Sequence, residues 1–250
     1  MKNLRKILTV VLRSIKSGGL INTLNKIFTG DLYSEEYGGL KPIKTRGLID
    51  TIKLFRYYYL FEVKYSTKTK RWVFPDDLNV ERKTPEHGTK YYPFDFLSLY
   101  RIFKFLPVDF KASVFLDLGC GKGRPLLVAL EHGFRKVIGV EYDKNLCDIC
   151  LNNLKNYAHS KNYDCNYEVI NIDASLYDVD DYVNVVLLFN PFDDYILDKV
   201  LSNINISIKR KNRILYIVYC NPVHEDKLSE EYHFFCRVDE KTIIYRLAYE

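Results

Sequence analysis

The sequence predicts an α/β protein with a doubly wound, mostly parallel seven-stranded sheet and an N-terminal helical extension. Three observations predict this fold. From residue 111 onward, apolar runs of strand length alternate with segments of helical periodicity. A glycine-rich turn follows the first of these runs, and two strand-like runs around a tight turn close the chain. We therefore expect a Rossmann-like domain at residues 95–250, preceded by a basic, partly helical extension at residues 1–94 that acts as a lid or docking element.

The individual elements follow from apolar patterning and from Pro and Gly positions. A helix is expected at residues 95–106, where Pro107 ends it, and another at residues 144–158. Between and after them the apolar runs predict parallel strands, and the last two runs predict an antiparallel pair. The expected strands span residues 114–118, 136–141, 167–170, 183–189, 214–219, 233–239 and 242–248.

The glycine-rich turn after the first strand is the most informative segment. Gly119, Gly121 and Gly123 stand at every second position, and Pro125 opens a helix directly afterwards. A strand, a glycine turn and a helix form the place where a doubly wound sheet receives a nucleotide-like ligand. A dinucleotide fingerprint would need glycine at position 124, where Arg124 stands. The spacing therefore argues against a dinucleotide.

The segment that begins at Asp117, Asp-Leu-Gly-Cys-Gly-Lys-Gly, resembles motif I of the class I S-adenosylmethionine-dependent methyltransferases. The resemblance covers about residues 95–250 and implies a seven-stranded Rossmann-like fold, methyl transfer as the activity and S-adenosyl-L-methionine as the cofactor. It also implies that the loop wraps the methionine half of this cofactor. The residues so assigned are Asp117, Gly119, Cys120, Gly121 and Gly123.

Further residues extend this assignment. Glu141 ends the second strand, 22 residues after Gly119, where a carboxylate can accept hydrogen bonds from both ribose hydroxyls. The resemblance implies that Asp173, after the third strand, meets the adenine amino group; the alternative is that it caps the next turn. Lys122 and Arg124 can pair with the cofactor's carboxylate or remain solvated.

The candidate catalytic residues are Asn190, Pro191 and Phe192, which follow the fourth strand. They resemble the Asn/Asp-Pro-Pro-aromatic motif of nitrogen methyltransferases, with Phe192 where the second Pro usually stands. The Asn190 side-chain oxygen and the Pro191 carbonyl can accept N–H bonds from an acceptor nitrogen, and Phe192 can wall the site. The alternative is a strand-terminating turn. A second pair, Asn221-Pro222, is interpreted as structural.

Composition bounds the remaining functions. Residues 1–98 hold 18 Lys/Arg against 10 Asp/Glu, a charge of +8, and the rest holds 19 against 22, a charge of −3. This diffuse basicity is a weak argument for nucleic acid. The close pair Cys147 and Cys150 lacks a second Cys or His pair at metal spacing, so we expect core thiols and no metal. Reduced thiols in an enzyme-like domain indicate a cytoplasmic protein.

The first 28 residues carry six Lys/Arg, no acid and an apolar stripe from Leu4 to Ile15, which predicts basic amphipathic helices. Such helices dock on their own domain, on a partner or on an anionic membrane, and docking on the domain is favoured over peripheral membrane contact.

The sequence thus predicts a methyltransferase that acts on a nitrogen of a protein, an amino sugar or a small metabolite. The methyl acceptor is not readable from the residues. Two alternatives stay open: a nucleic-acid N-methyltransferase, and a non-catalytic module that binds S-adenosylmethionine.

Overall fold

The computed structural model describes residues 53, 57, 59–69, 93–162, 164–189 and 192–248. Seven strands form a single sheet in the order β3-β2-β1-β4-β5-β7-β6. The first five strands pair in parallel, and β7 runs antiparallel to both β5 and β6. The expected seven-stranded, mostly parallel sheet is confirmed. The strands are β1 (Val114–Leu118), β2 (Lys136–Glu141), β3 (Tyr167–Asn171), β4 (Val183–Phe189), β5 (Leu215–Cys220), β6 (His233–Asp239) and β7 (Thr242–Leu247).

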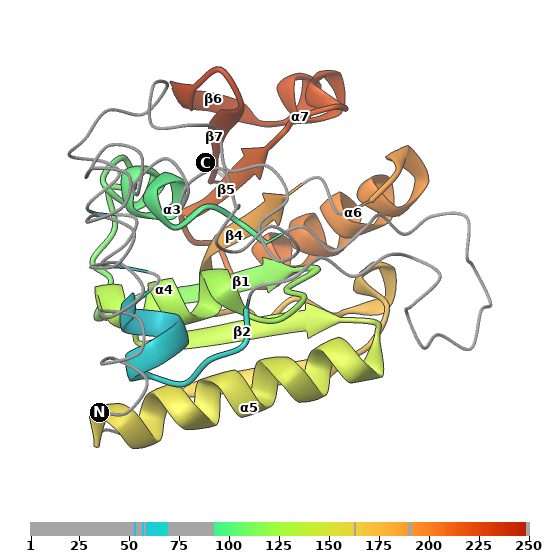
Figure 1. The fold of residues 1–250 in the computed structure, drawn as a ribbon. Coiled ribbons are helices and arrows are strands. Elements are labelled where there is room, and N and C mark those ends of the chain that lie inside the picture. The colour runs from blue at the N-terminus through green and yellow to red at the C-terminus, as the bar shows by residue number, and fades with distance from the viewer. Residues whose placement is uncertain are drawn as a thin grey trace.

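Helices cover both faces of this sheet (Figure 1). Side chains of α3, α4 and α5 share one buried apolar cluster with one face of the strands, and α6 shares the other cluster with the opposite face. Strand β1 shows how the faces separate, because Phe115 joins the first cluster while Leu116 joins the second. The helices are η2 (Tyr59–Lys64, a π-helical segment), α3 (Phe96–Phe103), α4 (Arg124–His132), α5 (Lys144–Lys161), η4 (Ala174–Leu176, a 3₁₀ turn), α6 (Asp194–Arg210) and α7 (Glu225–Glu231). Each helix in these described ranges is too short or too polar to cross a bilayer.

The helix expected at residues 95–106 is shorter than predicted. Asp95 is its N-cap, with Oδ2 accepting from the Ser98 backbone N–H at 3.1 Å. The helix ends at Phe103, well before Pro107, because the N–H groups of Lys104 and Phe105 bond carbonyls three residues back. The final turn therefore tightens and stops the α-helix before the proline.

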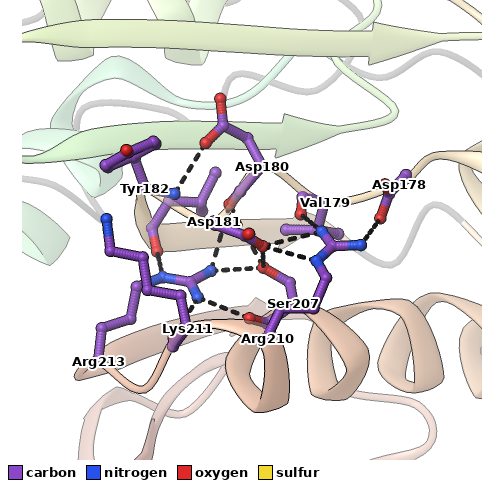
Figure 2. A network of polar contacts seen from close by, with 10 residues as sticks. Asp178, Val179, Asp180, Asp181, Tyr182, Ser207, Arg210, Lys211 and Arg213 are labelled. Atoms are coloured by element: carbon purple, nitrogen blue, oxygen red, sulfur yellow. Dashed lines mark hydrogen bonds and ion pairs between the residues drawn. The ribbon is translucent and has the colours of Figure 1, made fainter.

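The amino end of β4 is held by two arginines from the end of α6 and the loop after it (Figure 2). Arg210 donates to Asp178, Asp181 and the Val179 carbonyl. Arg213 donates to the Val183 and Asp180 carbonyls and to the Ser207 hydroxyl, at 2.7, 3.2 and 2.8 Å. This network fixes where β4 begins, at the edge of the sheet opposite the glycine loop.

Candidate functional site

The order of the strands places the candidate site at the carboxyl ends of β1 and β4. These two strands are parallel neighbours, although the chain passes through β2 and β3 between them. The connection after β1 leads to one side of the sheet and the chain returns to the other side at β4. Such a topological switch point is where open α/β sheets bind their ligands.

The glycine loop between β1 and α4 is held against the end of β2. The backbone N–H groups of Gly119 and Cys120 both donate to the Val140 carbonyl, at 2.9 and 3.0 Å. Gly123 has φ +77°, and a Cβ there would lie 2.4 Å from the Cys150 sulfur. Position 123 therefore needs glycine both for its backbone conformation and for its contact with α5.

Three acidic side chains are buried at this edge of the sheet, those of Asp117, Glu141 and Asp143. Asp117 is 2% exposed, and its Oδ2 atom has no hydrogen-bond partner among the residues that the structure describes. Burial, reinforced by the charge of Glu141, raises the pKa of Asp117 well above its usual value. A buried carboxyl with an unpartnered oxygen is costly for the fold, which is typical of functional sites.

Glu141 is 5% exposed and links the glycine loop to the start of α5. Its Oε2 accepts from the Gly121 N–H at 2.9 Å, and its Oε1 accepts from the Asp143 N–H at 3.0 Å. Burial raises the pKa of Glu141 to about 7, although these backbone donors oppose the shift. A carboxylate offers about four lone-pair sites. Both oxygens can therefore accept further hydrogen bonds from a ligand.

These residues fit the cofactor that the motif implies. The unpartnered Oδ2 of Asp117 can accept from a donor on the ligand, and Glu141 can accept from ribose hydroxyls. A glycine turn lets a ligand approach its backbone closely, and a Cβ at Gly123 would disturb this turn. Asp117, the glycine loop and Glu141 thus lie together at the carboxyl ends of β1 and β2. This arrangement suits a nucleoside with a cationic tail.

Asp173 caps the turn that follows it, which is the alternative to a contact with adenine that the sequence left open. It is the N-cap of η4, and its Oδ1 accepts from the Ser175 N–H at 2.8 Å. This contact accounts for an acid at this position, so a role toward adenine stays a prediction.

Among the candidate catalytic residues, Asn190 and Pro191 lie outside the described residues. Phe192 is partly buried and packs against the apolar cluster on the α6 face. Phe189, the last residue of β4, lies against Phe94, with ring centroids 4.5 Å apart. Residues 93–95 thus pass beside the end of β4.

The cysteines behave as expected for core thiols. Cys120 in the glycine loop and Cys147 and Cys150 in α5 are buried free thiols. Burial raises the pKa of Cys147 to about 12, so this thiol stays protonated at neutral pH. Within the part of the chain that the structure describes, no three His, Cys, Asp or Glu side chains are placed to hold a metal ion.

Arg124 is neither solvated nor directed at the loop, contrary to both interpretations made from the sequence. Its side chain is 3% exposed and donates to Thr69 and to the Phe94 carbonyl. The reason is its place at the first turn of α4, which faces residues 59–69 and 93–96. The interpretation failed because no local pattern marks a partner 55 residues away.

Two residues of the site region were missed from the sequence. Asp143 is the N-cap of α5, with Oδ1 accepting from Leu146 N–H at 2.7 Å, and its backbone N–H bonds Glu141. An Asp directly before a helical pattern is a sequence signal for an N-cap of this kind. Asn153 lies within α5, is 2% exposed and donates to the Lys122 carbonyl of the glycine loop. Its polarity on an apolar helix face is the only signal for it.

No protein-family model matches the chain, and no curated protein matches it. Solved structures similar to the chain include an RNA methyltransferase from Salinibacter ruber in complex with S-adenosyl-L-homocysteine. The identity there is 18%, with 63% of this chain and 93% of that chain covered and a TM-score of 0.45. A tRNA (uracil-54, C5)-methyltransferase from Pyrococcus abyssi, in complex with the same compound, is 13% identical, covering 66% and 41% at a TM-score of 0.44.

A third similar structure is the StiE O-methyltransferase, residues 961–1257, at 20% identity and a TM-score of 0.41. The match covers 56% of this chain and 52%, about half, of that one. The names of these three proteins all indicate methyl transfer, and they differ in the acceptor. Likeness at these identities and TM-scores does not assign an activity to this chain.

Proposed function

We propose that this chain is an S-adenosylmethionine-dependent methyltransferase that transfers the methyl group to a nitrogen atom. The observation that carries the proposal is that Asp117, the glycine loop and Glu141 lie together at the switch point of the sheet. Glu141 accepts from the ribose hydroxyls, and Asp117 accepts from a donor on the methionine half of the ligand. The loop lets the ligand lie close to the backbone.

S-adenosylmethionine supplies an electrophilic methyl group on a sulfonium sulfur. The chain's part is then to position the acceptor in line with that group and to exclude water. Asn190 and Pro191 directly follow β4, which borders β1 in the sheet. In this proposal, the role of the Asn190 side-chain oxygen and the Pro191 carbonyl is to accept N–H bonds from the acceptor, which would orient its nitrogen lone pair. Phe192 walls the acceptor side.

Cofactor binding is tested first, by calorimetry of the purified protein with S-adenosylhomocysteine and with NAD. We expect binding of the first compound and none of the second, because position 124 lacks the glycine of a dinucleotide site. Binding of NAD without binding of S-adenosylhomocysteine would refute the assignment.

The catalytic assignment is tested with Asn190→Ala. This variant is expected to lose about 10²–10³ in transfer rate, as when one preorganised polar group is removed, with cofactor affinity unchanged. The matched control is Asn221→Gly, in the Asn-Pro pair that follows β5. Asn221 has φ +50°, which glycine also adopts, and its N–H bonds the Lys241 carbonyl at 2.7 Å. Near-normal transfer by Asn190→Ala would make Asn190 a turn residue.

The acceptor is found by incubating a cell extract with purified protein and labelled S-adenosylmethionine. Label in a nitrogen of a protein or small metabolite supports the proposal. Label in RNA or DNA would move the assignment to a nucleic-acid methyltransferase, for which binding falls steeply with salt. Cofactor binding without any labelled product would favour a non-catalytic binding module.

A further inference from the structure

Residues 59–69 lie in the part of the chain that the sequence assigns to an extension, yet they pack into the core. Phe61 is fully buried and stacks on Phe96 of α3, with ring centroids 4.9 Å apart and an interplanar angle of 8°. Tyr65 meets the ring of Tyr157 on α5 edge-on, at 5.0 Å. The helical part of the segment, η2, therefore packs against α3 and α5, and residues 66–69 lead from it toward the start of α4 (Figure 1).

One polar bridge from this segment to the glycine loop runs through Asn153 on α5. The Asn153 Oδ1 accepts from the Lys68 backbone N–H at 2.7 Å. Its Nδ2 donates to the Lys122 carbonyl at 2.9 Å, and Lys122 stands between Gly121 and Gly123. A single buried amide thus holds both backbones in register. The amide oxygen faces Lys68 and the amide nitrogen faces Lys122, so a flip of the amide would break both hydrogen bonds.

A second bridge runs through Arg124, the residue directly after Gly123. Its guanidinium donates to the Thr69 hydroxyl and carbonyl at 2.9 and 3.1 Å, and to the Phe94 carbonyl at 2.8 Å. Glu62 lies 3.9 Å from it, and this carboxylate also accepts from the Thr69 N–H and hydroxyl. A buried guanidinium is costly without such partners. The Arg124 side chain at the start of α4 therefore depends on Thr69, Glu62 and the Phe94 carbonyl for its polar contacts.

We propose that residues 59–69 form a brace for the cofactor loop, with Asn153 and Arg124 as positioning residues that set the affinity for S-adenosylmethionine. The inference rests on the proposed function, since it takes the loop to bind that cofactor. Gly119, Gly121 and Gly123 all have positive φ, and glycines leave a loop many alternative conformations. A brace that removes these alternatives before binding lowers the entropy that binding must overcome.

The first test is Asn153→Asp against Asn156→Asp. The aspartate at 153 still accepts from Lys68 but cannot donate to the Lys122 carbonyl, which it repels. Asn156 lies one turn further along α5 and donates to the Ser66 carbonyl of the same segment at 2.9 Å. Among the described residues its side-chain hydrogen bond goes to this segment and not to the loop, so its substitution alters the segment alone.

We expect Asn153→Asp to raise the dissociation constant of S-adenosylhomocysteine by about tenfold, the scale of one unmade buried hydrogen bond. Asn156→Asp should stay within about twofold, as for an exposed contact. Calorimetry is done well below each variant's melting temperature. Hydrogen exchange of the ligand-free protein is the second readout: amides of residues 117–124 should exchange faster in Asn153→Asp and unchanged in Asn156→Asp.

The second test compares Arg124→Lys with Arg213→Lys. Both arginines are enclosed by backbone carbonyls, but Arg213 serves the amino end of β4, away from the loop (Figure 2). Both variants should lose thermal stability, and only Arg124→Lys should lose affinity. If Arg124→Lys does not fold, Thr69→Val, which removes one acceptor of Arg124, takes its place.

A folded Asn153→Asp protein with unchanged affinity and unchanged loop exchange would overturn the brace. Equal loss of affinity in Asn156→Asp or Arg213→Lys would do the same, because the effect would then be general destabilisation. If the unaltered protein does not bind S-adenosylhomocysteine, the proposed function fails instead. The exchange of the ligand-free loop then still decides whether the brace exists.

Discussion

Affinity for S-adenosylhomocysteine should rise with pH through about 7, because the ionised carboxylate of Glu141 accepts from the ribose hydroxyls more strongly than the protonated carboxyl does. Burial is the main cause that raises the pKa of Glu141 to about 7, and the charge of Asp143 adds to it. The carboxyl is thus mostly protonated at pH 6 and mostly ionised at pH 8. A ligand that binds only the ionised form gains about tenfold in affinity between these values, or ~1.4 kcal/mol for one pKa unit.

The assay is calorimetric titration with S-adenosylhomocysteine at half-unit steps from pH 6 to pH 8. Glu141→Gln is the control, since it keeps an acceptor oxygen and has no proton to lose. It should bind more weakly and with a flat profile. A flat profile in the unaltered protein, or a rise that persists in Glu141→Gln, would refute the reasoning. Asp117 lies in the same site with a raised pKa, and the control retains it.

The same ionisation has the opposite effect on the ligand-free protein. The native state keeps the proton of Glu141 up to a higher pH than the unfolded chain does. The stabilising contribution of this group is therefore present below pH 4.5 and is lost as the pH rises through about 7. Stability and affinity should thus run in opposite directions over this range, and Glu141→Gln should abolish the affinity trend and remove the contribution of Glu141 to the stability trend.

Three further substitutions test the packing of the site. Gly123→Ala forces a Cβ to 2.4 Å from the Cys150 sulfur at φ +77°, and should lower both the melting temperature and the calorimetric affinity. Gly139→Ala places a Cβ 2.7 Å from both the Cys120 sulfur and the Leu126 Cδ1, so denaturant unfolding should show a loss of about 1–3 kcal/mol from overpacking. Asp117→Asn removes a buried ionisable group whose pKa is raised, so it should raise the melting temperature at pH 8 more than at pH 5 and weaken binding; an equal change at both pH values would contradict this.

The centre of the sheet was predictable because β1, β2, β4 and β5 are buried along most of their length. Strands β2 and β4 have the predicted bounds, since mainly apolar residues fill each of them and all but one residue of β2 and five of the seven residues of β4 are buried. The end of α3 was not predictable from Pro107. The backbone tightens four residues earlier, where Phe103 is already packed among Phe115 and Phe134. Tertiary packing, which no local pattern records, decides that boundary.

The part of the candidate site that could be predicted from the sequence is the part that follows from motif spacing. Motif spacing places the glycine loop and Glu141 together, and the hydrogen bond from Gly121 to Glu141 joins them. Arg124 and Asn153 were not predictable in this way. Their partners, Thr69 and Lys68, lie 55 and 85 residues away, in a segment without a recognisable pattern. Long-range polar pairing of this kind is seen only once the chain is folded.

Glu141 shows why the loop and the ligand cannot be treated as independent. The oxygen that accepts from the Gly121 N–H belongs to the carboxylate that we propose binds ribose. Removal of the carboxylate therefore takes away a ligand contact and releases the middle of the loop at the same time. Glu141→Ala should for this reason cost more affinity than the two ribose bonds alone, whose loss is worth about 1–3 kcal/mol. Glu141→Gln, which keeps an acceptor for Gly121, separates the two effects: its affinity should fall between those of Glu141→Ala and the unaltered protein. Equal affinities of the two variants would mean that the bond to Gly121 contributes nothing to binding.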